Sequence, residues 1–246
     1  MEKNALITGA GRRIGRAIAI KLAKQGWNIA LHHNKSAEAA EELAAGISAM
    51  GRKTVLVSGD LAHADDITQI FEAAHADLGP LSCLINNASL FEPDTLASVT
   101  TESFQSHLSV NLMAPVLLMS AFSKQNLDGQ GNIINIIDQR VANLRPGFLS
   151  YTLSKSALWT LTQSAAMELA PKIRVNAIAP GPTLANKRQS AAQFKQQCQS
   201  VPLQYGPTEN EIAEGVSFLL GARSMTGEMI MMDGGEHLSS SQAVEE

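Results

Sequence analysis

Short apolar runs alternate with longer amphipathic segments along most of this chain. The apolar runs cover 4–8, 27–33, 53–58, 81–85, 132–137, 173–178 and 227–232. Between them, apolar residues recur at helical spacing, as in Ile14, Ile18 and Leu22, which indicates helices with one buried face. Strands that alternate with helices predict an α/β fold, a doubly wound parallel sheet of about seven strands with helices on both faces.

The pattern also sets the expected organisation of the chain. Long helices are predicted over 37–50, 101–124, 149–170 and 209–220. The segment 184–206 is polar, rich in glutamine and weakly helical, which is typical of a mobile lid or of a surface helix and loop. We find no internal repeat or linker, so we expect one domain over 1–238 and an unpacked polar tail over 239–246.

A glycine-rich turn follows the first predicted strand and opens a helix. Gly9, Gly11 and Gly15 bring the backbone into a tight turn, and a helix N-terminus offers free N–H groups to a phosphate. Strand, glycine turn and helix together are typical of the dinucleotide site of a Rossmann fold. A simple tight turn between strand and helix is the alternative.

The end of the second strand bears on the choice of cofactor. An acidic residue about 20 positions beyond the glycines binds the ribose hydroxyl in NAD sites, but here Asn34, Lys35 and Ser36 follow the strand. A lysine and a hydroxyl suit a 2′-phosphate, and Arg13 offers a second cation, so NADP is favoured over NAD. The alternative is a helix-capping Ser36 beside a solvated Lys35.

Candidate acid–base chemistry lies near Tyr151 and Lys155. At the start of a helix these residues lie on one face, one turn apart. A phenol has a pKa of about 10, and a nearby cation makes it a better proton donor. Asp138 ends the fifth strand, and Ser89 follows the fourth, where open α/β sheets bind ligands. Asn111 within a helix either has a specific partner or faces water.

Composition excludes several classes of function. The 246 residues are 45% hydrophobic with a net charge of -4, and no basic cluster suits nucleic acid. Cys83 and Cys198 fit no metal or redox spacing, and scattered histidines indicate no metal site. No secretory leader and no apolar run of transmembrane length is recognised, so we expect a cytoplasmic protein that does not bind membranes.

Four motifs in order carry a resemblance to the short-chain dehydrogenase/reductase family. They are Thr8-Gly9 to Gly15, Asn86-Asn87-Ala88, Tyr151-x-x-x-Lys155 and Pro180-Gly181. The resemblance implies that Tyr151 donates a proton, that Lys155 binds the nicotinamide ribose, and that Asn111 holds a water that links this lysine to solvent. It implies NADPH or NADP binding at Gly9, Arg12, Arg13, Ile14, Asn34, Lys35, Ser36, Asp60, Leu61, Asn87, Ala88, Tyr151, Lys155, Pro180, Gly181 and Thr183. It also implies a homotetramer.

Three departures from the family pattern narrow the resemblance. Asp138 stands where the family usually has a serine, 13 residues before the tyrosine; Arg13 replaces a glycine of the turn; and Ser89 follows Asn-Asn-Ala, with Phe91 two residues later. These departures resemble the pteridine reductases of the family. They imply a pterin substrate that stacks between Phe91 and the nicotinamide and is bound by Arg13, Ser89, Asp138 and Tyr151.

The leading hypothesis is therefore an NADPH-dependent pterin reductase. A carboxylate beside the phenol suits proton relay to a ring nitrogen better than it suits polarising a ketone. A carbonyl reductase of the 3-oxoacyl type is the first alternative, and a non-catalytic NADP(H)-binding regulator is the second.

Overall fold

The structure is a computed structural model and describes residues 2–239. Seven parallel strands form one sheet in the order β3-β2-β1-β4-β5-β6-β7. They are β1 (Asn4–Ile7), β2 (Asn28–His33), β3 (Thr54–Ser58), β4 (Cys83–Asn86), β5 (Gly131–Ile136), β6 (Ile173–Pro180) and β7 (Met229–Met232). The doubly wound parallel sheet expected from the sequence is confirmed. Of the predicted tail, 240–246 lie outside the described residues.

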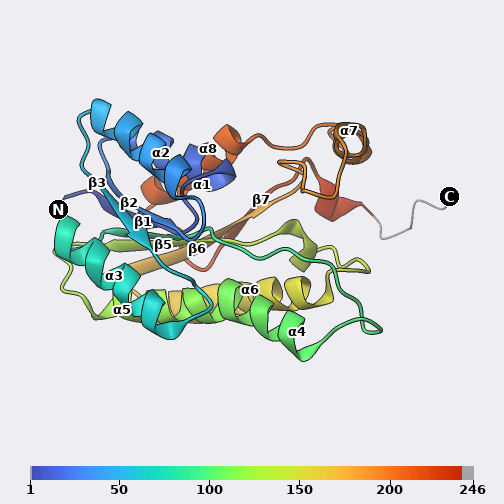
Figure 1. The fold of residues 1–246 in the computed structure, drawn as a ribbon, viewed down its shortest axis with the longest axis horizontal. Coiled ribbons are helices and arrows are strands. Elements are labelled where there is room, and N and C mark those ends of the chain that lie inside the picture. The colour runs from blue at the N-terminus through green and yellow to red at the C-terminus, as the bar shows by residue number, and fades with distance from the viewer. Residues whose placement is uncertain (1, 240–246) are drawn as a thin grey trace.

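Helices cover both faces of the sheet (Figure 1). One layer holds α1 (Arg13–Lys24), α2 (Ala37–Ala49) and α8 (Glu209–Gly221), and the other holds α3 (Ala64–Leu78), α4 (Thr101–Leu108), α5 (Ala114–Lys124) and α6 (Leu149–Leu169). Helix α7 (Ala191–Ser200) lies apart from both layers, and single 3-10 turns cover Gln139–Val141 and Glu236–Leu238.

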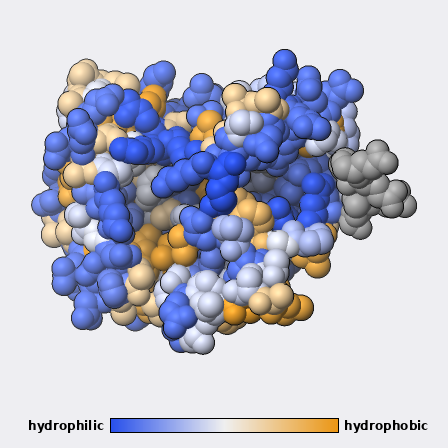
Figure 2. All heavy atoms as spheres, turned by 45° about the vertical axis from the view of Figure 1, so that its right-hand side comes forward, coloured by the Kyte–Doolittle hydropathy of each residue, from blue (hydrophilic) through white to orange (hydrophobic). Residues whose placement is uncertain are grey.

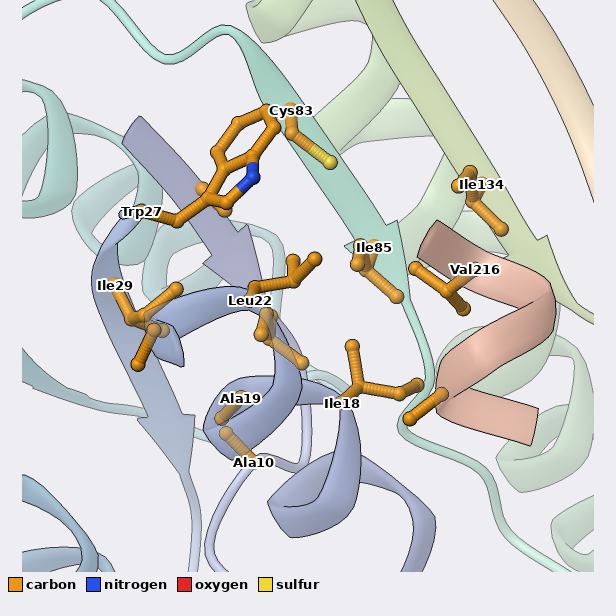
Figure 3. Close-up of a cluster of buried hydrophobic side chains, with 14 of the residues drawn as sticks. Ala10, Ile18, Ala19, Leu22, Trp27, Ile29, Cys83, Ile85, Ile134 and Val216 are labelled. Atoms are coloured by element: carbon orange, nitrogen blue, oxygen red, sulfur yellow. The ribbon is translucent and has the colours of Figure 1, made fainter. Parts of the chain in front are cut away.

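The core beneath α1 and α8 shows why the apolar pattern produces this packing. Ile18 and Leu22 of α1 face Ile85 of β4, and Val216 reaches the same cluster from α8 (Figure 3). All four side chains are fully buried, and burial of each aliphatic side chain contributes about 1.5–3 kcal/mol. A second cluster fills the opposite face, where α3 and α5 pack together.

One predicted helix is interrupted. The segment 101–124 was expected to be a regular helix, but Ser109–Met113 forms a π-helical turn between α4 and α5. Such wide turns often occur at functional sites. Asn111 lies in this turn and is fully buried, so the alternative in which it faces water is wrong.

The same segment bears on the membrane prediction. Thr101–Lys124 is long and apolar enough to cross a membrane by length and composition, so the expectation that no run reaches that length is wrong. Leu118 and Phe122 of α5 are fully buried in the core, and α4 and α5 pack against α3 and α6. In this structure the segment is a core helix.

The strand order places a ligand site at one end of the sheet. The chain runs outward from β1 to β3 and then returns to β4 on the other side of β1. This reversal leaves a crevice at the carboxyl ends of β1 and β4, where doubly wound folds bind ligands. The segments that follow β5, β6 and β7 meet the same end.

Candidate active site

The glycine turn occupies the crevice between β1 and β4. Gly9 has a φ of +64°, and a Cβ on Gly15 would lie 2.3 Å from the Gly9 carbonyl oxygen, so neither position accepts a side chain. The amide of Asn87 donates to the Thr8 and Gly9 carbonyls at 2.8 and 3.2 Å. The turn is therefore a backbone cradle fixed to β4, as a pyrophosphate site requires.

His32 holds the other side of this turn, and sequence analysis gave it no role. Its Nδ1 accepts from the Gly9 N–H at 3.1 Å, and its Nε2 therefore carries the proton and donates to the Gly59 carbonyl at 3.1 Å. Burial lowers the pKa of His32 to about 4, which keeps the ring neutral and able to accept. A histidine on a buried strand carries no sequence signal for this bond.

Asp138 and Tyr151 are in direct contact. The Tyr151 hydroxyl donates to Asp138 Oδ2 at 2.7 Å, and the Arg140 backbone N–H donates to Oδ1 at 2.8 Å. Lys155 Nζ lies 5.8 Å from the centroid of the Tyr151 ring and donates to the Ile136 carbonyl at 2.8 Å. The sequence predicted that Asp138, Tyr151 and Lys155 lie close together, and the structure places them so.

The electrostatics of this cluster differ from the prediction. Burial raises the pKa of Tyr151 above its usual range, and the Asp138 carboxylate raises it further, so the expected depression of this pKa by Lys155 is wrong. Burial also raises the pKa of Asp138, although bonds from Arg140 and Tyr151 partly oppose the change. Burial lowers the pKa of Lys155 to about 8. Burial therefore favours the neutral form of each of the three groups.

Asn111 and Asp94 fix the frame around this cluster. The Asn111 side chain donates to the Leu90 carbonyl and to Ser154 Oγ, and its oxygen accepts from the Leu90 N–H at 2.8 Å. Asp94 Oδ1 accepts from the backbone N–H of Ser150 at 2.9 Å. Asp94, which sequence analysis missed, therefore fastens the loop after β4 to the first turn of α6.

Phe91 has an aromatic partner that the sequence did not indicate. Its ring stacks on Phe148 with centroids 4.2 Å apart and planes 1° apart, and it meets Tyr151 edge-on at 4.6 Å. The Arg188 guanidinium lies 5.6 Å from both phenylalanine centroids. The single Phe91 platform that was predicted is therefore a stacked pair, with its second ring supplied by a residue just before α6.

Two arginines tie the predicted lid to the rest of the site. Arg13 donates to the Leu184 and Ala185 carbonyls at 3.4 and 3.0 Å, and Arg188 pairs with Glu92 at 2.6 Å. Arg13 was expected to bind cofactor and substrate, but in this arrangement its guanidinium holds the start of the lid segment.

A cavity of about 560 Å³ brings most of the predicted site together. The predicted residues that line it are Gly9, Arg12, Arg13, Ile14, Asn87, Ala88, Ser89, Phe91, Asp138, Tyr151, Lys155, Pro180, Gly181 and Thr183. Figure 2 turns this end of the molecule forward and shows hydrophobic atoms between predominantly hydrophilic ones. The cavity wall combines apolar side chains with the bonded Asp138 and Tyr151, as in sites that bind small molecules.

Other predicted residues lie outside the cavity wall. They are Asn34, Lys35, Ser36, Asp60, Leu61 and Asn111. The Ser36 side chain lies against the glycine turn, because a Cβ on Gly11 would be 2.9 Å from its Oγ. Ser36 precedes α2 but makes no side-chain capping bond, so the capping alternative is not supported. Lys35 is exposed beside it.

No group of three or more His, Cys, Asp or Glu side chains suited to a metal ion occurs within residues 2–239. Cys83 is buried, and Cys198 is half-buried beneath the Pro182 carbonyl.

Comparison with known proteins shows the family to which this chain belongs. The model of the short chain dehydrogenase family matches residues 3–196. The chain is 32% identical to the 3-oxoacyl-[acyl-carrier-protein] reductase FabG of Staphylococcus aureus, over 97% of this chain and 99% of FabG.

Two solved structures are similar in fold and sequence. FolM alternative dihydrofolate reductase 1 from Brucella canis, complexed with NADP, has a TM-score of 0.95 and 41% identity, over 99% of this chain and 97% of that one. Its counterpart from Brucella suis, also in complex with NADP, has a TM-score of 0.93 and 43% identity, over 96% of each chain. The chain belongs to the short-chain dehydrogenase/reductase family.

Proposed function

We propose that this protein is an NADPH-dependent reductase that converts a dihydropterin to a tetrahydropterin, with folates as further substrates. The observation that carries the proposal is the 2.7 Å bond from the Tyr151 hydroxyl to Asp138 inside the cavity. The similarity to the FolM dihydrofolate reductases, at 41% and 43% identity, supports the same substrate class.

The residues present fit a nicotinamide dinucleotide. The glycine turn leaves no room for a Cβ at Gly15, and its free backbone suits a pyrophosphate. Lys35, Ser36 and Asn34 would bind the 2′-phosphate, and Asp60 and Leu61 would contact the adenine. Asn87, Ala88 and the segment 180–183 line the cavity where the nicotinamide would lie. The FolM structures with NADP support this cofactor.

The chain supplies the proton for the reaction. When bound, the cofactor supplies a hydride to the ring carbon of a C=N bond. Tyr151 donates its phenolic proton to the adjacent ring nitrogen, and the proton on Asp138 then restores the phenol across the 2.7 Å bond. Burial raises the pKa of Asp138, so this carboxyl group carries a proton at higher pH than an exposed one does. Lys155 would bind the ribose, whereas the Asn111 side chain is already bonded to Leu90 and Ser154.

The substrate ring would lie against the stacked Phe91 and Phe148 side chains. Aromatic rings stack with flat heterocycles, and the Ser89 hydroxyl at the cavity wall would bond the polar edge of the ring. Phe148 has a φ of 54° and follows Gly147 at φ 76°, so the backbone that carries it bends sharply before α6. Arg13 contacts the substrate only if the start of the lid shifts.

A carbonyl reductase is the second candidate, favoured by the 32% identity to FabG. A serine at this position would donate to a ketone oxygen, whereas Asp138 accepts from the Tyr151 hydroxyl at 2.7 Å in this structure. Asp138→Ser separates the two, because it should improve reduction of a 3-oxoacyl thioester and weaken pterin reduction. A purely regulatory role would require that Tyr151→Phe leave biological activity unchanged.

The location and assembly are further proposals. We expect a cytoplasmic homotetramer formed through α5, α6 and β7. Leu153 and Met167 of α6 are 46% and 78% exposed, and Val116 of α5 is 39% exposed, which supports burial of this layer against another copy. Light scattering should give four times the monomer mass, and the monomer mass would contradict this proposal.

Steady-state assays test the substrate class. NADPH oxidation should be fast with dihydrobiopterin, dihydromonapterin or dihydrofolate. No oxidation with any of the three would end the proposal.

A further inference from the structure

The turn that follows Asp138 places two unpartnered polar side chains at the cavity. Gln139 and Arg140 both line it. Gln139 is 4% exposed, and its Oε1 is buried without a hydrogen-bond partner. Arg140 Nη1 is likewise buried without a partner. Within residues 2–239 neither side chain donates or accepts any hydrogen bond.

Leaving such groups unpaired is costly. A buried polar atom without a partner costs about 1–3 kcal/mol, and more when it is charged, so native proteins satisfy most of them. The neighbouring cations follow this rule: Arg13 bonds Leu184 and Ala185, and Arg145 lies 3.2 Å from Glu236. Arg140 therefore has capacity that a bound molecule would use.

Arg140 is also held in place. Its Cζ lies 5.0 Å from the centroid of Phe148, and its backbone N–H is bonded to Asp138. The guanidinium is thus fixed between the aromatic wall of the cavity and the acid–base pair. An arginine held in this way recognises oxygen atoms with little loss of side-chain entropy.

The two groups differ in what they recognise. The Gln139 oxygen accepts a hydrogen bond, and the Arg140 guanidinium only donates. The complementary ligand edge has an N–H next to a carbonyl oxygen, which is a lactam. A pterin has such an edge on its oxo-pyrimidine ring, whereas a 3-oxoacyl thioester has no ring N–H.

We propose that Gln139 and Arg140 bind the lactam edge of the substrate, with Gln139 Oε1 accepting from the ring N–H and Arg140 donating to the carbonyl oxygen. This assignment rests on the proposed function. It makes Gln139 and Arg140 specificity-determining residues, because together they favour binding of a 4-oxo ring over a 4-amino ring. A 4-amino ring presents donors to the guanidinium and loses this bond.

Paired ligands and variants test the assignment. Arg140→Leu, Arg140→Lys and Gln139→Leu are compared with wild type and with Arg223→Leu, which removes an exposed arginine outside the cavity wall. Dissociation constants of the NADPH-loaded proteins are measured for a 2-amino-4-oxopteridine and for a 2,4-diaminopteridine, beside KM and kcat for the dihydropterin. NADPH affinity and thermal denaturation report on the fold.

In Arg140→Leu, affinity for the 4-oxo ring should fall about 10- to 100-fold, as expected for a lost hydrogen bond to a charged group, and affinity for the diamino ring should change less than threefold. Gln139→Leu should show the same selectivity with a smaller loss, and Arg140→Lys should retain part of the binding. If Arg140→Leu does not fold, the other two variants decide.

If the variants lost equal affinity for the 4-oxo and the diamino ring, Gln139 and Arg140 would only support the loop. If they lost affinity for neither ring, the two side chains would not touch the ligand. If the wild type still reduces pterins, either result overturns the binding of the lactam edge by Gln139 and Arg140 and leaves the proposed function standing. A wild type that neither binds nor reduces a pterin overturns the proposed function as well.

Discussion

Replacement of Asp138 by asparagine separates the charge of this side chain from its shape. The Tyr151 hydroxyl and the Arg140 N–H bond different oxygens of Asp138, at 2.7 and 2.8 Å, and the single oxygen of asparagine keeps one of these two bonds. Asparagine has no proton to transfer at neutral pH. The size and shape of the side chain are therefore retained, and the substitution removes the proton relay together with one of these two hydrogen bonds.

The size of the effect follows from the relay. General acid–base groups typically contribute about 10²- to 10⁴-fold to a rate, which corresponds to about 3 to 5 kcal/mol of transition-state stabilisation. We expect kcat for the dihydropterin to fall by that factor in Asp138→Asn. The Asp138 carboxylate raises the pKa of Lys155, which is about 8, so this pKa should fall further in the variant.

The pH profile makes the prediction specific. Burial raises the pKa of Asp138 above the usual 3.8, and its protonated form restores Tyr151, so wild-type kcat should decrease as pH rises through this raised pKa. The variant has no carboxyl group to titrate, and its kcat should be flat over the same interval.

Stopped-flow and steady-state measurements of NADPH oxidation across pH provide the assay. Asp128→Asn, an exposed substitution in a loop, is the matched control and should behave like wild type. NADPH affinity should be unchanged in both variants. If Asp138→Asn kept more than a third of wild-type kcat with an unaltered pH profile, the relay would be wrong.

Three further predictions concern other parts of the site. Lys35→Asp should reduce the preference for NADPH over NADH about 10- to 100-fold; equal preference in the wild type would contradict the 2′-phosphate site. The pKa of His32 falls from 6.5 to about 4 on folding, so the free energy of unfolding should decrease by about 3 kcal/mol as the pH drops from 6.5 to 4. In chemical denaturation, His32→Gln should show a much smaller decrease over the same pH interval. Arg188→Ala removes the guanidinium over Phe91 and should raise the pterin KM several-fold with NADPH affinity unchanged, whereas an unchanged KM would mean that Arg188 acts only on the surface.

The fold could be predicted because buried parallel strands appear in sequence as apolar runs, and all seven were found with ends shifted by a few residues. Their carboxyl ends had to meet at one edge, so Asp138 and Tyr151 were correctly expected to lie together. The π-helical turn at Asn111 was not predicted, because one extra residue per turn barely disturbs a helical pattern.

The features of the site that the sequence did not predict depend on loop conformation and on burial. Phe148 and Arg188 lie far from Phe91 in sequence, and only tertiary packing brings them to it. The pKa of Tyr151 depends on burial and on Asp138, whereas its spacing from Lys155 suggested the opposite direction. Loop geometry and desolvation are properties of the folded chain that local patterns do not encode.

A competition between the two candidate substrate classes tests the central assignment most directly. Wild-type protein with limiting NADPH is offered equal concentrations of a dihydropterin and a 3-oxoacyl thioester, and both products are quantified by mass spectrometry. The Asp138–Tyr151 relay predicts tetrahydropterin as the dominant product. Hydroxyacyl thioester with no tetrahydropterin would contradict it.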